Sequence, residues 1–562
     1  MSAAIPSPSP TAALFFDPDG YLLTGPKLMG RQSAGNAFLR AATLAHPDTP
    51  LSVYATQIQS ARIFADLIKS FNPRARAQWI PADRVDLVAR VGTLFFPGPG
   101  LGDPARLRLR VGTAAYSLVG VTHTLASHTA MDNILDLINA PVMPWDALIC
   151  TSRAGGASVK CLLEAQIEYL NWRFGSLRSI TLPQLPVIPL GVHCADFEHT
   201  PAEREAARRS MGIGPAEVVV LFVGRLSFHA KAHPHPMYLG LQAAAERSGA
   251  KITLIQSGAF ANEFIGEAFK QAASQFCPGV NCLFSDGKDF AAHRRCWAAA
   301  DVFMSLSDNI QETFGLTPIE AMAAGLPVVV SDWDGYKDTV REGIDGFRIP
   351  TWMPPANLGE PYARAYEAGI DNYDFYSGLN CQTVSVDAAL LAERLTELVK
   401  NPALRQHMGA CGRERARQQY DWAVIYRQYQ TLWTRLTETR QAAASDPQLR
   451  PLLTEAPRVA PGRMDPYHIF AHYPTRLIQT TTRVSRTVSP TAIPYSELLT
   501  HGLYNYAGKI LPHPDVAERL LRLCQQSPLT VAQLASQSGL ETGQVALVLA
   551  PLAKMGLVRL ED

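Results

Sequence analysis

The chain has 562 residues, which is too long for one compact core and predicts two large domains with something smaller. Its 51 basic and 50 acidic residues leave a formal net charge of +1, which argues against a protein that coats nucleic acid or an anionic membrane by bulk electrostatics. The hydrophobic fraction of 47% and the charged fraction of 18% are those of an ordinary globular protein. Any anion is therefore expected to bind at a local site.

The nine cysteines are scattered along the chain without any CxxC spacing, which is typical of reduced thiols and gives no reason to expect zinc. The opening MSAAIPSPSPTAALFF lacks the basic region and the long apolar core of a signal peptide. No later run approaches the roughly 18 apolar residues of a membrane span. These features predict a cytoplasmic protein without a transmembrane segment.

After an expected flexible N-terminus over 1–11, residues 12–200 alternate short β-rich runs with helical stretches. Helical spacing of apolar residues is clear in NAFLRAATLA and ASVKCLLEAQIEYLNWRF. This alternation predicts a parallel sheet with crossover helices, a Rossmann-like domain. The runs are apolar almost throughout, as suits strands buried on both faces, and comprise ALFF, LSVYA, GTLFFPG, AYSLVGVTHTL, DALICTS and LPVIPLGV.

A second series of the same kind predicts another Rossmann-like domain over 201–440. Its helical segments include MYLGLQAAAERSG, and the chain from residue 402 to residue 439 is expected to form long helices that close this second domain. The sequence thus predicts an α/β protein with two doubly wound domains in tandem. The expected strands of the second domain are EVVVLFVG, KITLIQSG, VNCLFSDG, DVFMSLS and LPVVVSD.

Residues 441–466 are rich in Ala, Pro and polar residues and are expected to be a linker. Residues 467–562 follow, and LTVAQLASQSGLETGQVALVLAPLAKMGLVRLED in them resembles a winged helix-turn-helix. A DNA-reading helix offers Arg, Lys, Asn or Gln to base edges, but this one offers only Gln544 and Lys554. The module is therefore expected to serve interaction or dimerisation instead of DNA reading, which gives a possible route to a homo-oligomer.

The most informative segment is DVFMSLSDNIQETFGLTPIEAMAAGLPVVVSD, which predicts a strand, a polar loop and a short helix. Thr317 fits the N-cap of that helix, Pro318 its first position and Glu320 its third, completing a capping box, and Gly325 ends it. Ligands of open α/β sheets bind outside the carboxyl ends of strands, where this helix points unpaired N–H groups. The segment therefore predicts an anion site made of backbone.

Glu312 and Glu320 lie eight residues apart, and both can reach a ligand docked at that helix end. With FGL between them and EAMAAGLPVV after them, they resemble the donor-site motif of the retaining glycosyltransferases of GT-B fold, in the group related to sucrose synthases and phosphatidylinositol mannosyltransferases. The resemblance implies two Rossmann-like domains that face a cleft, with Glu312 beside the donor sugar and Glu320 on the ribose hydroxyls. It implies further donor contacts from Phe314, Gly315, Leu316 and Thr317. The alternative is that Glu320 only caps its helix and Glu312 is a solvated loop residue.

The strand VVVLFVG runs into a loop that holds Arg225 and Lys231. Cleavage of a nucleoside diphosphate from a sugar leaves growing negative charge, which a bidentate Arg and a mobile Lys can stabilise in place of a divalent ion. Members of the family place the lysine five residues after the arginine, whereas here it is six, which puts the loop path and Lys231 in doubt. The alternative is a surface salt bridge. A metal site from the histidines of this loop is not expected, because no carboxylate is nearby.

In the first domain, YLLTGPKLMGRQSAGNAFLRA predicts a strand, a glycine-containing loop and a helix. Gly35 fits the family's loop glycine, at which backbone approaches phosphate or acceptor, although a glycine at a helix start is common anyway. Arg31 either contacts the acceptor or is merely solvated. Gly191 and Asp196, in VIPLGVHCADF, are expected to be structural.

The strand AYSLVGVTHTLAS ends with His123, at the place where many family members have a histidine beside the donor sugar. A neutral imidazole there can accept or donate a hydrogen bond with a sugar hydroxyl or with the reacting acceptor oxygen. A satisfied core histidine is the alternative. His128 is the second candidate, although its sequence context predicts the start of a helix.

Together these features predict an enzyme that moves a sugar from a nucleotide diphosphate sugar to a hydroxyl of an unidentified glycan, lipid or small molecule. The resemblance implies retention of anomeric configuration by front-face attack, without a metal or other cofactor. A phosphorylase or a nucleotide-sugar epimerase is a rival within the fold, but nothing marks a pyridoxal phosphate lysine. A rival of another class is a non-catalytic sugar-nucleotide sensor whose C-terminal module reports to a partner.

Overall fold

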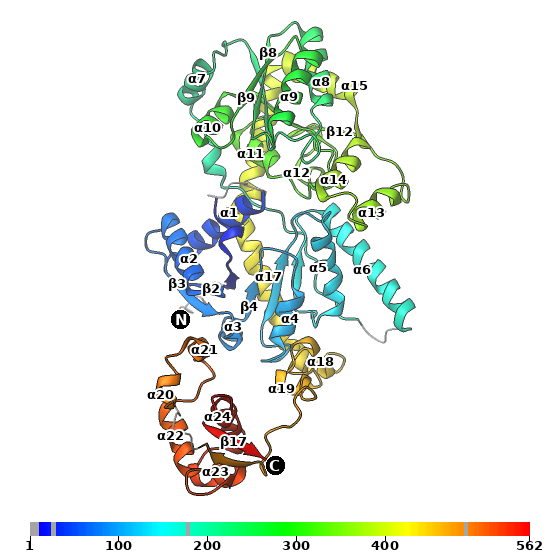
Figure 1. The fold of residues 1–562 in the computed structure, drawn as a ribbon. Coiled ribbons are helices and arrows are strands. Elements are labelled where there is room, and N and C mark those ends of the chain that lie inside the picture. Colours follow the sequence, from blue (N-terminus) through cyan, green and yellow to red (C-terminus); the bar gives the residue numbers. More distant parts are fainter. Residues whose placement is uncertain (1–10, 24–29, 176–179, 488–492) are drawn as a thin grey trace, which may run out of the picture. The chain divides into compact units, whose positions relative to one another are not determined.

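The computed structural model describes residues 11–23, 30–175, 180–487 and 493–562. The chain divides into two compact units, Met1–Ala460 and Pro461–Asp562, which are coloured from blue to yellow and from orange to red in Figure 1. The expected flexible N-terminus falls, except for residue 11, outside the described residues. The first unit contains two lobes, each built on one parallel sheet.

The first lobe holds a six-stranded parallel sheet in the order β3-β2-β1-β4-β5-β6. Helices connect the strands, among them α1 (Gly30–Ala45), α2 (Ile58–Phe71), α5 (His128–Asn139) and α6 (Arg153–Phe174). The strands are β1 (Ala13–Phe15), β2 (Leu51–Ala55), β3 (Ala77–Pro81), β4 (Thr93–Phe95), β5 (Ser117–Val121) and β6 (Ala147–Ile149).

Two strands of this sheet differ from the sequence prediction. LPVIPLGV, residues 185–192, makes only isolated bridges such as Cys150↔Val187, because Pro186 and Pro189 have no N–H to donate to a ladder. The third strand, β3, has a mixed apolar and polar sequence at the sheet edge, so periodicity did not reveal it.

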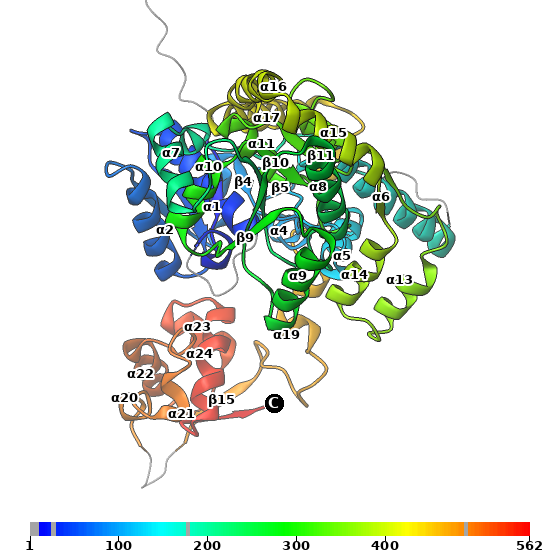
Figure 2. The ribbon, with the colours of Figure 1, turned by 90° about the horizontal axis from the view of Figure 1, so that it is seen from above.

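The second lobe holds another six-stranded parallel sheet, in the order β12-β11-β10-β7-β8-β9. Side chains alternate along β7: Val219 and Leu221 pack on one face of the sheet, Val220 and Phe222 on the other. Seen from above, α10 (Phe290–Ala299) and α8 (His235–Ser248) lie on opposite sides of the strands (Figure 2). The strands are β7 (Val218–Val223), β8 (Ile252–Ser257), β9 (Asn281–Ser285), β10 (Val302–Ser305), β11 (Val328–Ser331) and β12 (Gly346–Ile349).

The fold class is therefore α/β with two doubly wound sheets, the arrangement of a GT-B protein. An excursion of the chain over residues 351–387 separates β12 from α15 (Ala388–Lys400). It comprises β13 (Thr351–Trp352), α13 (Glu360–Glu367), α14 (Tyr373–Gln382) and β14 (Ser385–Val386), and β13 and β14 pair as an antiparallel ladder that closes its base. None of these elements was predicted from the sequence.

The last long helix of the first unit belongs to a different lobe from the one predicted. After α16 (Pro402–Arg415) and a π-helical turn at Ala416–Tyr420, α17 (Trp422–Ala442) packs into the core of the first lobe, beside β4 in Figure 1. Its aromatic rings contact Phe38 and Phe95, which explains the crossing, because burial of an aromatic face stabilises the helix only where a matching apolar surface is free.

The segment predicted to be a linker is packed chain up to residue 460. Ala443 and α18 (Arg450–Thr454) cover Met143 and Trp145 of the first lobe, and the Thr113 hydroxyl donates to the Leu452 carbonyl at 3.0 Å. The linker prediction over 441–466 is therefore wrong for most of its length. Its prolines and alanines lie in short helical turns that pack against the first lobe.

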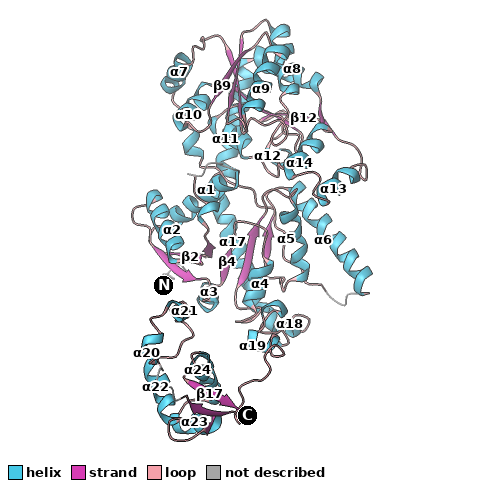
Figure 3. Cartoon of the chain, in the orientation of Figure 1, coloured by secondary structure: helices cyan, strands magenta, loops and turns pink. Residues whose placement is uncertain are grey.

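The second unit has a core of its own. An antiparallel sheet in the order β16-β15-β17 packs against α22 (Pro514–Leu523), α23 (Val531–Ser538) and α24 (Thr542–Lys554), as the secondary-structure colours of Figure 3 show. The strands are β15 (Arg483–Arg486), β16 (Leu529–Thr530) and β17 (Val558–Glu561). The two helical patterns and the final strand lie where the sequence placed them, and the winged-helix assignment stays a prediction. In the part of the chain that is described, no helix has the length and apolarity needed to cross a membrane.

Candidate functional site

A cavity of about 330 Å³ lies between the two lobes of the first unit. The first lobe contributes the amino end of α1 and the chain after β5, and the second lobe contributes the chain after β7 and after β10 together with α11 (Leu316–Ala324). These are carboxyl ends of strands and amino ends of helices, as expected for a ligand site in open α/β sheets. The predicted residues that line it are Arg31, His123, Arg225, Lys231, Glu312, Phe314, Gly315, Leu316, Thr317 and Glu320.

The helix α11 begins two residues earlier than the capping box predicts. Its N-cap is Gly315 at φ +81°, where a Cβ atom would lie 1.9 Å from the Tyr336 ring, so only glycine fits. Thr317 is thus inside the first turn, and the predicted Thr317–Glu320 capping box is wrong. Among the described residues no side chain caps this helix, so its first N–H groups are left for a ligand in the cavity.

Two loops meet in the cavity. The cation loop is residues 224–234, between β7 and α8, and the glutamate loop is residues 308–315, between β10 and α11. Lys231 forms an ion pair with Glu312, and both side chains are largely buried, at 18% and 15% exposed. Burial lowers the pKa of Lys231, but the Glu312 carboxylate and the Tyr336 side chain together outweigh that effect and hold the pKa above its ordinary value. The six-residue spacing places Lys231 in the site, because its side chain returns over Gly224, with Cε 3.2 Å from where a Cβ atom would lie.

Arg225 lies in the same cavity as Glu312. Its Nη2 donates to the Ala230 carbonyl at 3.0 Å, which closes the cation loop on itself, and to the side-chain oxygen of Gln311 at 2.5 Å. Gln311 directly precedes Glu312, so Arg225 ties the two loops together. The surface salt bridge considered as an alternative for Arg225 is not what the structure shows.

Glu320 faces the cavity with its acceptor atoms unused. Burial raises the pKa of its carboxyl to about 7, and Lys231 opposes this shift. No described residue donates a hydrogen bond to this carboxylate. The side chain is half-buried at the cavity wall, and because no protein group donates to it, the carboxylate is available to paired hydroxyls of a ligand.

His123 is held as a neutral imidazole. Its Nε2 lies 3.1 Å from the Pro97 carbonyl, which can only accept, so Nε2 carries the proton and Nδ1 is left as an acceptor. Burial lowers the pKa of His123 to about 4. His128, the second candidate, instead begins α5 and stacks on the Tyr366 ring at 3.7 Å.

Gly35 is not in a ligand-binding loop. It lies inside α1, where a Cβ atom would come within 2.4 Å of the Gly20 carbonyl oxygen, so its missing side chain permits packing in the first lobe. Gly30, at the start of the same helix, lines the cavity in its place. Gly191 packs on Trp422, and Asp196 pairs with Arg40 at 2.5 Å, which are the structural roles expected.

The three histidines of the cation loop do not converge. His229 lies near Ser227, whereas the His235 N–H donates to the ring of His233. Over the described residues no cluster of three or more His, Cys, Asp or Glu side chains could hold a metal ion. Sequence reasoning missed Gln311, whose only signal was its place beside Glu312, and Thr124, the neighbour of His123.

Comparison with known proteins agrees with this geometry. The family profile described as glycosyl transferases group 1 matches residues 203–356, a segment that holds Arg225, Lys231, Glu312 and Glu320. The D-inositol 3-phosphate glycosyltransferase of Mycolicibacterium gilvum is 31% identical over 32% of this chain and 39% of its own length. The alpha-maltose-1-phosphate synthase of Mycolicibacterium smegmatis is 27% identical over 56% of this chain and 74% of its own length.

The chain spans half or less of the length of several curated relatives that it matches. Among solved structures, Anabaena Alr3699/HepE in complex with UDP aligns with 76% of this chain and 100% of its own at 16% identity and a TM-score of 0.49. The matched profile spans the loops and the helix that form one wall of the cavity, so this part of the chain is similar to the glycosyl transferases group 1.

Proposed function

We propose that this chain is a retaining glycosyltransferase that moves a sugar from a nucleoside diphosphate sugar to an acceptor hydroxyl. One observation carries the proposal: Arg225, Lys231 and Glu312 meet the uncapped amino end of α11 in a single interlobe cavity. The names of the relatives, which are glycosyltransferases and a maltose-1-phosphate synthase, support the same class of reaction.

The diphosphate of the donor would lie at the amino end of α11. The free N–H groups of the first turn and the partial positive charge of the helix end attract it, and Arg225 and Lys231 add two full charges. A donor that enters the cavity replaces the ion pair between Lys231 and Glu312 with two contacts of its own: Lys231 to the diphosphate and Glu312 to the sugar. Arg225 and Lys231 thus stabilise the negative charge of the departing diphosphate, for which other transferases use a divalent ion.

A second cavity of about 360 Å³ is proposed for the nucleoside base. It lies at the carboxyl ends of β8 and β9, between Phe260, Phe284 and Lys288. It adjoins the first cavity, since Gly258 in its wall packs on the carbonyl of Gly224, and a Cβ atom there would lie 1.8 Å from that oxygen. Glu320 then takes the ribose hydroxyls between base and diphosphate, with the acceptor atoms that the protein leaves unused.

In the reaction, the C–O bond between sugar and diphosphate breaks while the acceptor oxygen attacks from the same face. The departing phosphate oxygen takes the acceptor proton, and Arg225 and Lys231 stabilise its charge. Glu312 stabilises the positive charge that develops on the sugar. His123, neutral and with Nδ1 free to accept, orients a hydroxyl of the sugar or of the acceptor. Closure of the lobes excludes water, which would otherwise compete as acceptor.

The second candidate is a sensor that binds the same donor and reports through the second unit. The exposed face of α24 favours it, because Leu547 there is 56% exposed although the unit has a core of its own. Purified chain incubated with UDP-, GDP- and ADP-sugars decides between the two. Release of the nucleoside diphosphate, even slowly and without acceptor, is expected of the enzyme, whereas binding without release would favour the sensor.

A further inference from the structure

The excursion over 351–387 contacts a cavity-lining residue of each lobe, Gln311 in the second and Thr124 in the first. Its helix α14 begins at Tyr373, whose hydroxyl lies 2.9 Å from Nε2 of Gln311 and 3.0 Å from the hydroxyl of Thr124. Gln311 belongs to the glutamate loop of the second lobe, and Thr124 follows His123 in the first lobe. One phenol group thus joins a loop of each lobe.

The direction of these hydrogen bonds follows from Arg225. Because the Gln311 carbonyl oxygen accepts from Arg225, its NH₂ group must face Tyr373 and donate to it. The phenol O–H is then free to donate to Thr124. The result is an unbroken chain of hydrogen bonds from Arg225 through Gln311 and Tyr373 to Thr124, which runs from the second lobe to the first.

Further residues of α14 pack on both the cation loop and the glutamate loop. Gly378 packs directly on His229 of the cation loop, where a Cβ atom would lie 2.9 Å from the His229 Cβ. The Cys381 thiol lies 3.3 Å from the Phe228 carbonyl and 3.1 Å from the carboxylate of Asp308, which begins the glutamate loop. A displacement of α14 would therefore move the supports of Arg225, Lys231 and Glu312 together.

A second contact between the lobes reinforces the first. The Tyr366 ring of α13 stacks on His128 at 3.7 Å on one side and on Tyr376 of α14 at 4.6 Å on the other. The Tyr366 hydroxyl also accepts the backbone N–H of His128 at 3.3 Å. The excursion therefore holds the start of α5 by ring stacking and the chain after β5 by the Tyr373 hydroxyl.

We propose that Tyr373 is a positioning residue that latches the two lobes and, through the same hydroxyl, orients Gln311 and thereby Arg225. The hydrogen bond from Tyr373 to Thr124 forms only when the lobes meet. Closure of the lobes and orientation of Arg225 therefore occur together. Water is then excluded at the moment when Arg225 is aligned. The role of Arg225 in this inference rests on the proposed function, whereas the latch itself does not.

Hydrogen exchange of the full-length chain without ligand tests the latch directly. Tyr373→Phe removes the hydroxyl and keeps the ring, and is expected to speed amide exchange by about 3- to 10-fold in two separate stretches, 124–131 and 309–316, the scale of one lost hydrogen bond. Tyr362→Phe is the matched control, because no described partner contacts its hydroxyl, and wild-type exchange is expected. Unchanged exchange in Tyr373→Phe would overturn the proposal.

Calorimetry with UDP, GDP and ADP adds a double-mutant cycle. If the Tyr373 and Thr124 hydroxyls act as one unit, Tyr373→Phe and Thr124→Val each weaken binding of the preferred nucleotide by about 3- to 10-fold, and the double variant loses no more than the worse single one. Fully additive losses would contradict the coupling. If wild-type chain binds none of the three nucleotides, the proposed function fails, and the exchange experiment still decides the latch.

Discussion

Glu320 shows at one residue how a binding site opposes stability. A carboxyl group that burial pushes toward a pKa of about 7 is ionised at neutral pH only at a cost to the folded state. No described residue compensates with a hydrogen bond, and Lys231 is engaged by Glu312. The cost is understandable if the missing donors are hydroxyl groups of a ligand.

Replacement of Glu320 with Gln is therefore expected to stabilise the chain and to weaken donor binding. The unfolded carboxyl has a pKa near 4.5 and the folded one near 7, so the folded chain keeps a proton that the unfolded chain has lost between these values. The free energy of unfolding of the wild type thus falls as pH rises from about 4.5 to about 7. The gain from Glu320→Gln should be on the order of 2 kcal/mol at pH 8 and much smaller at pH 5.

Thermal melts of both proteins at pH 5 and pH 8, with and without UDP, GDP and ADP, measure this pair of effects. A nucleotide should raise the melting temperature of the wild type more than that of the variant. A variant that is less stable than wild type at pH 8 would show that Glu320 has a structural partner after all.

Replacement of Glu312 or Arg225 is expected to reduce turnover strongly and to leave the fold intact. Both lie in loops, and Glu312→Gln keeps the shape of the side chain while it removes the charge that faces the sugar. Donor hydrolysis should fall by at least about 100-fold in Glu312→Gln and in Arg225→Ala, because each removes charge stabilisation of the transition state. Circular dichroism should remain close to that of the wild type in both variants, whereas the melting temperature of Glu312→Gln should fall because Lys231 loses its counter-charge. Retention of more than a tenth of the activity in either variant would reject that residue's role.

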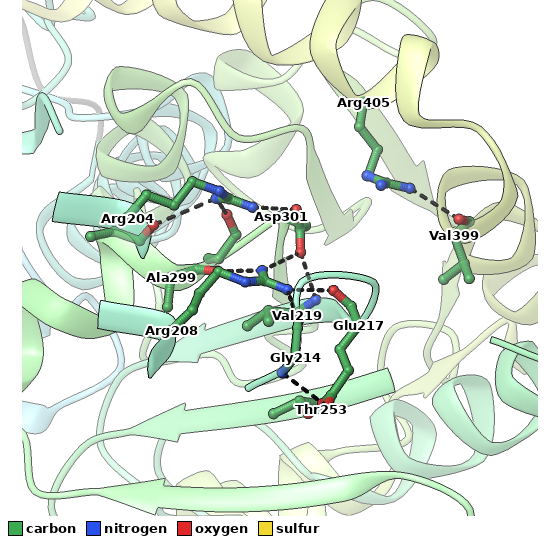
Figure 4. A network of polar contacts seen from close by, with 12 residues as sticks. Arg204, Arg208, Gly214, Glu217, Val219, Thr253, Ala299, Asp301, Val399 and Arg405 are labelled. Atoms are coloured by element: carbon green, nitrogen blue, oxygen red, sulfur yellow. Dashed lines mark hydrogen bonds and ion pairs between the residues drawn. The ribbon is translucent and has the colours of Figure 1, made fainter. Parts of the chain in front are cut away.

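At the scale of elements, buried ion networks fix α7 (Pro201–Ser210) to the second sheet, as Figure 4 shows. Asp301 precedes β10 and accepts from Arg204 at 2.5 Å, from Arg208 at 3.0 Å and from the Val219 N–H at 2.8 Å. Arg208 also donates to the carbonyl of Ala299. These bonds lock the helix that leads into β7, and hence the strand that carries the cation loop.

Asp301→Ala is expected to destabilise the second lobe by about 3–5 kcal/mol, because it leaves the Arg208 guanidinium buried, at 9% exposed, without its counter-charge. Glu205→Ala breaks an ion pair on the same helix in which both side chains are at least two-thirds exposed, and should change stability by less than about 0.5 kcal/mol. Urea unfolding of both variants measures the contrast. Equal losses would show that burial does not decide the strength of these pairs.

The elements differ in how far the sequence could predict them. Strands such as β7 and β11 are almost continuous apolar runs because both faces are covered, and such runs can be recognised directly in the sequence. The apolar face of α17 is equally clear, but periodicity does not say which lobe offers the matching surface. The start of α11 was misplaced because Tyr336, from another part of the chain, excludes any Cβ at residue 315. Tyr373 had no local signal, since its partners lie 62 and 249 residues away.

At the scale of the whole molecule, the described walls of both cavities belong to the first unit. Every residue that lines the two cavities, and every residue of the Tyr373 latch, lies before residue 461, where the first compact unit ends. The second unit is built around a core made only of its own residues, from Val484 to Val558. We therefore expect the described walls of both cavities to form without the second unit.

A chain that ends at Ala460 is accordingly expected to keep donor binding and donor hydrolysis within about 2-fold of the full chain, because α17 and α18 still complete the core of the first lobe. A chain that ends at Tyr420 is the matched control: it keeps every cavity residue but loses the aromatic face of α17, and should fail to fold. Calorimetry with UDP, GDP and ADP and an assay of nucleoside diphosphate release measure both. If the chain ending at Ala460 folds and binds the nucleotide but releases none, the second unit takes part in catalysis, and the separation inferred from the two cores is wrong.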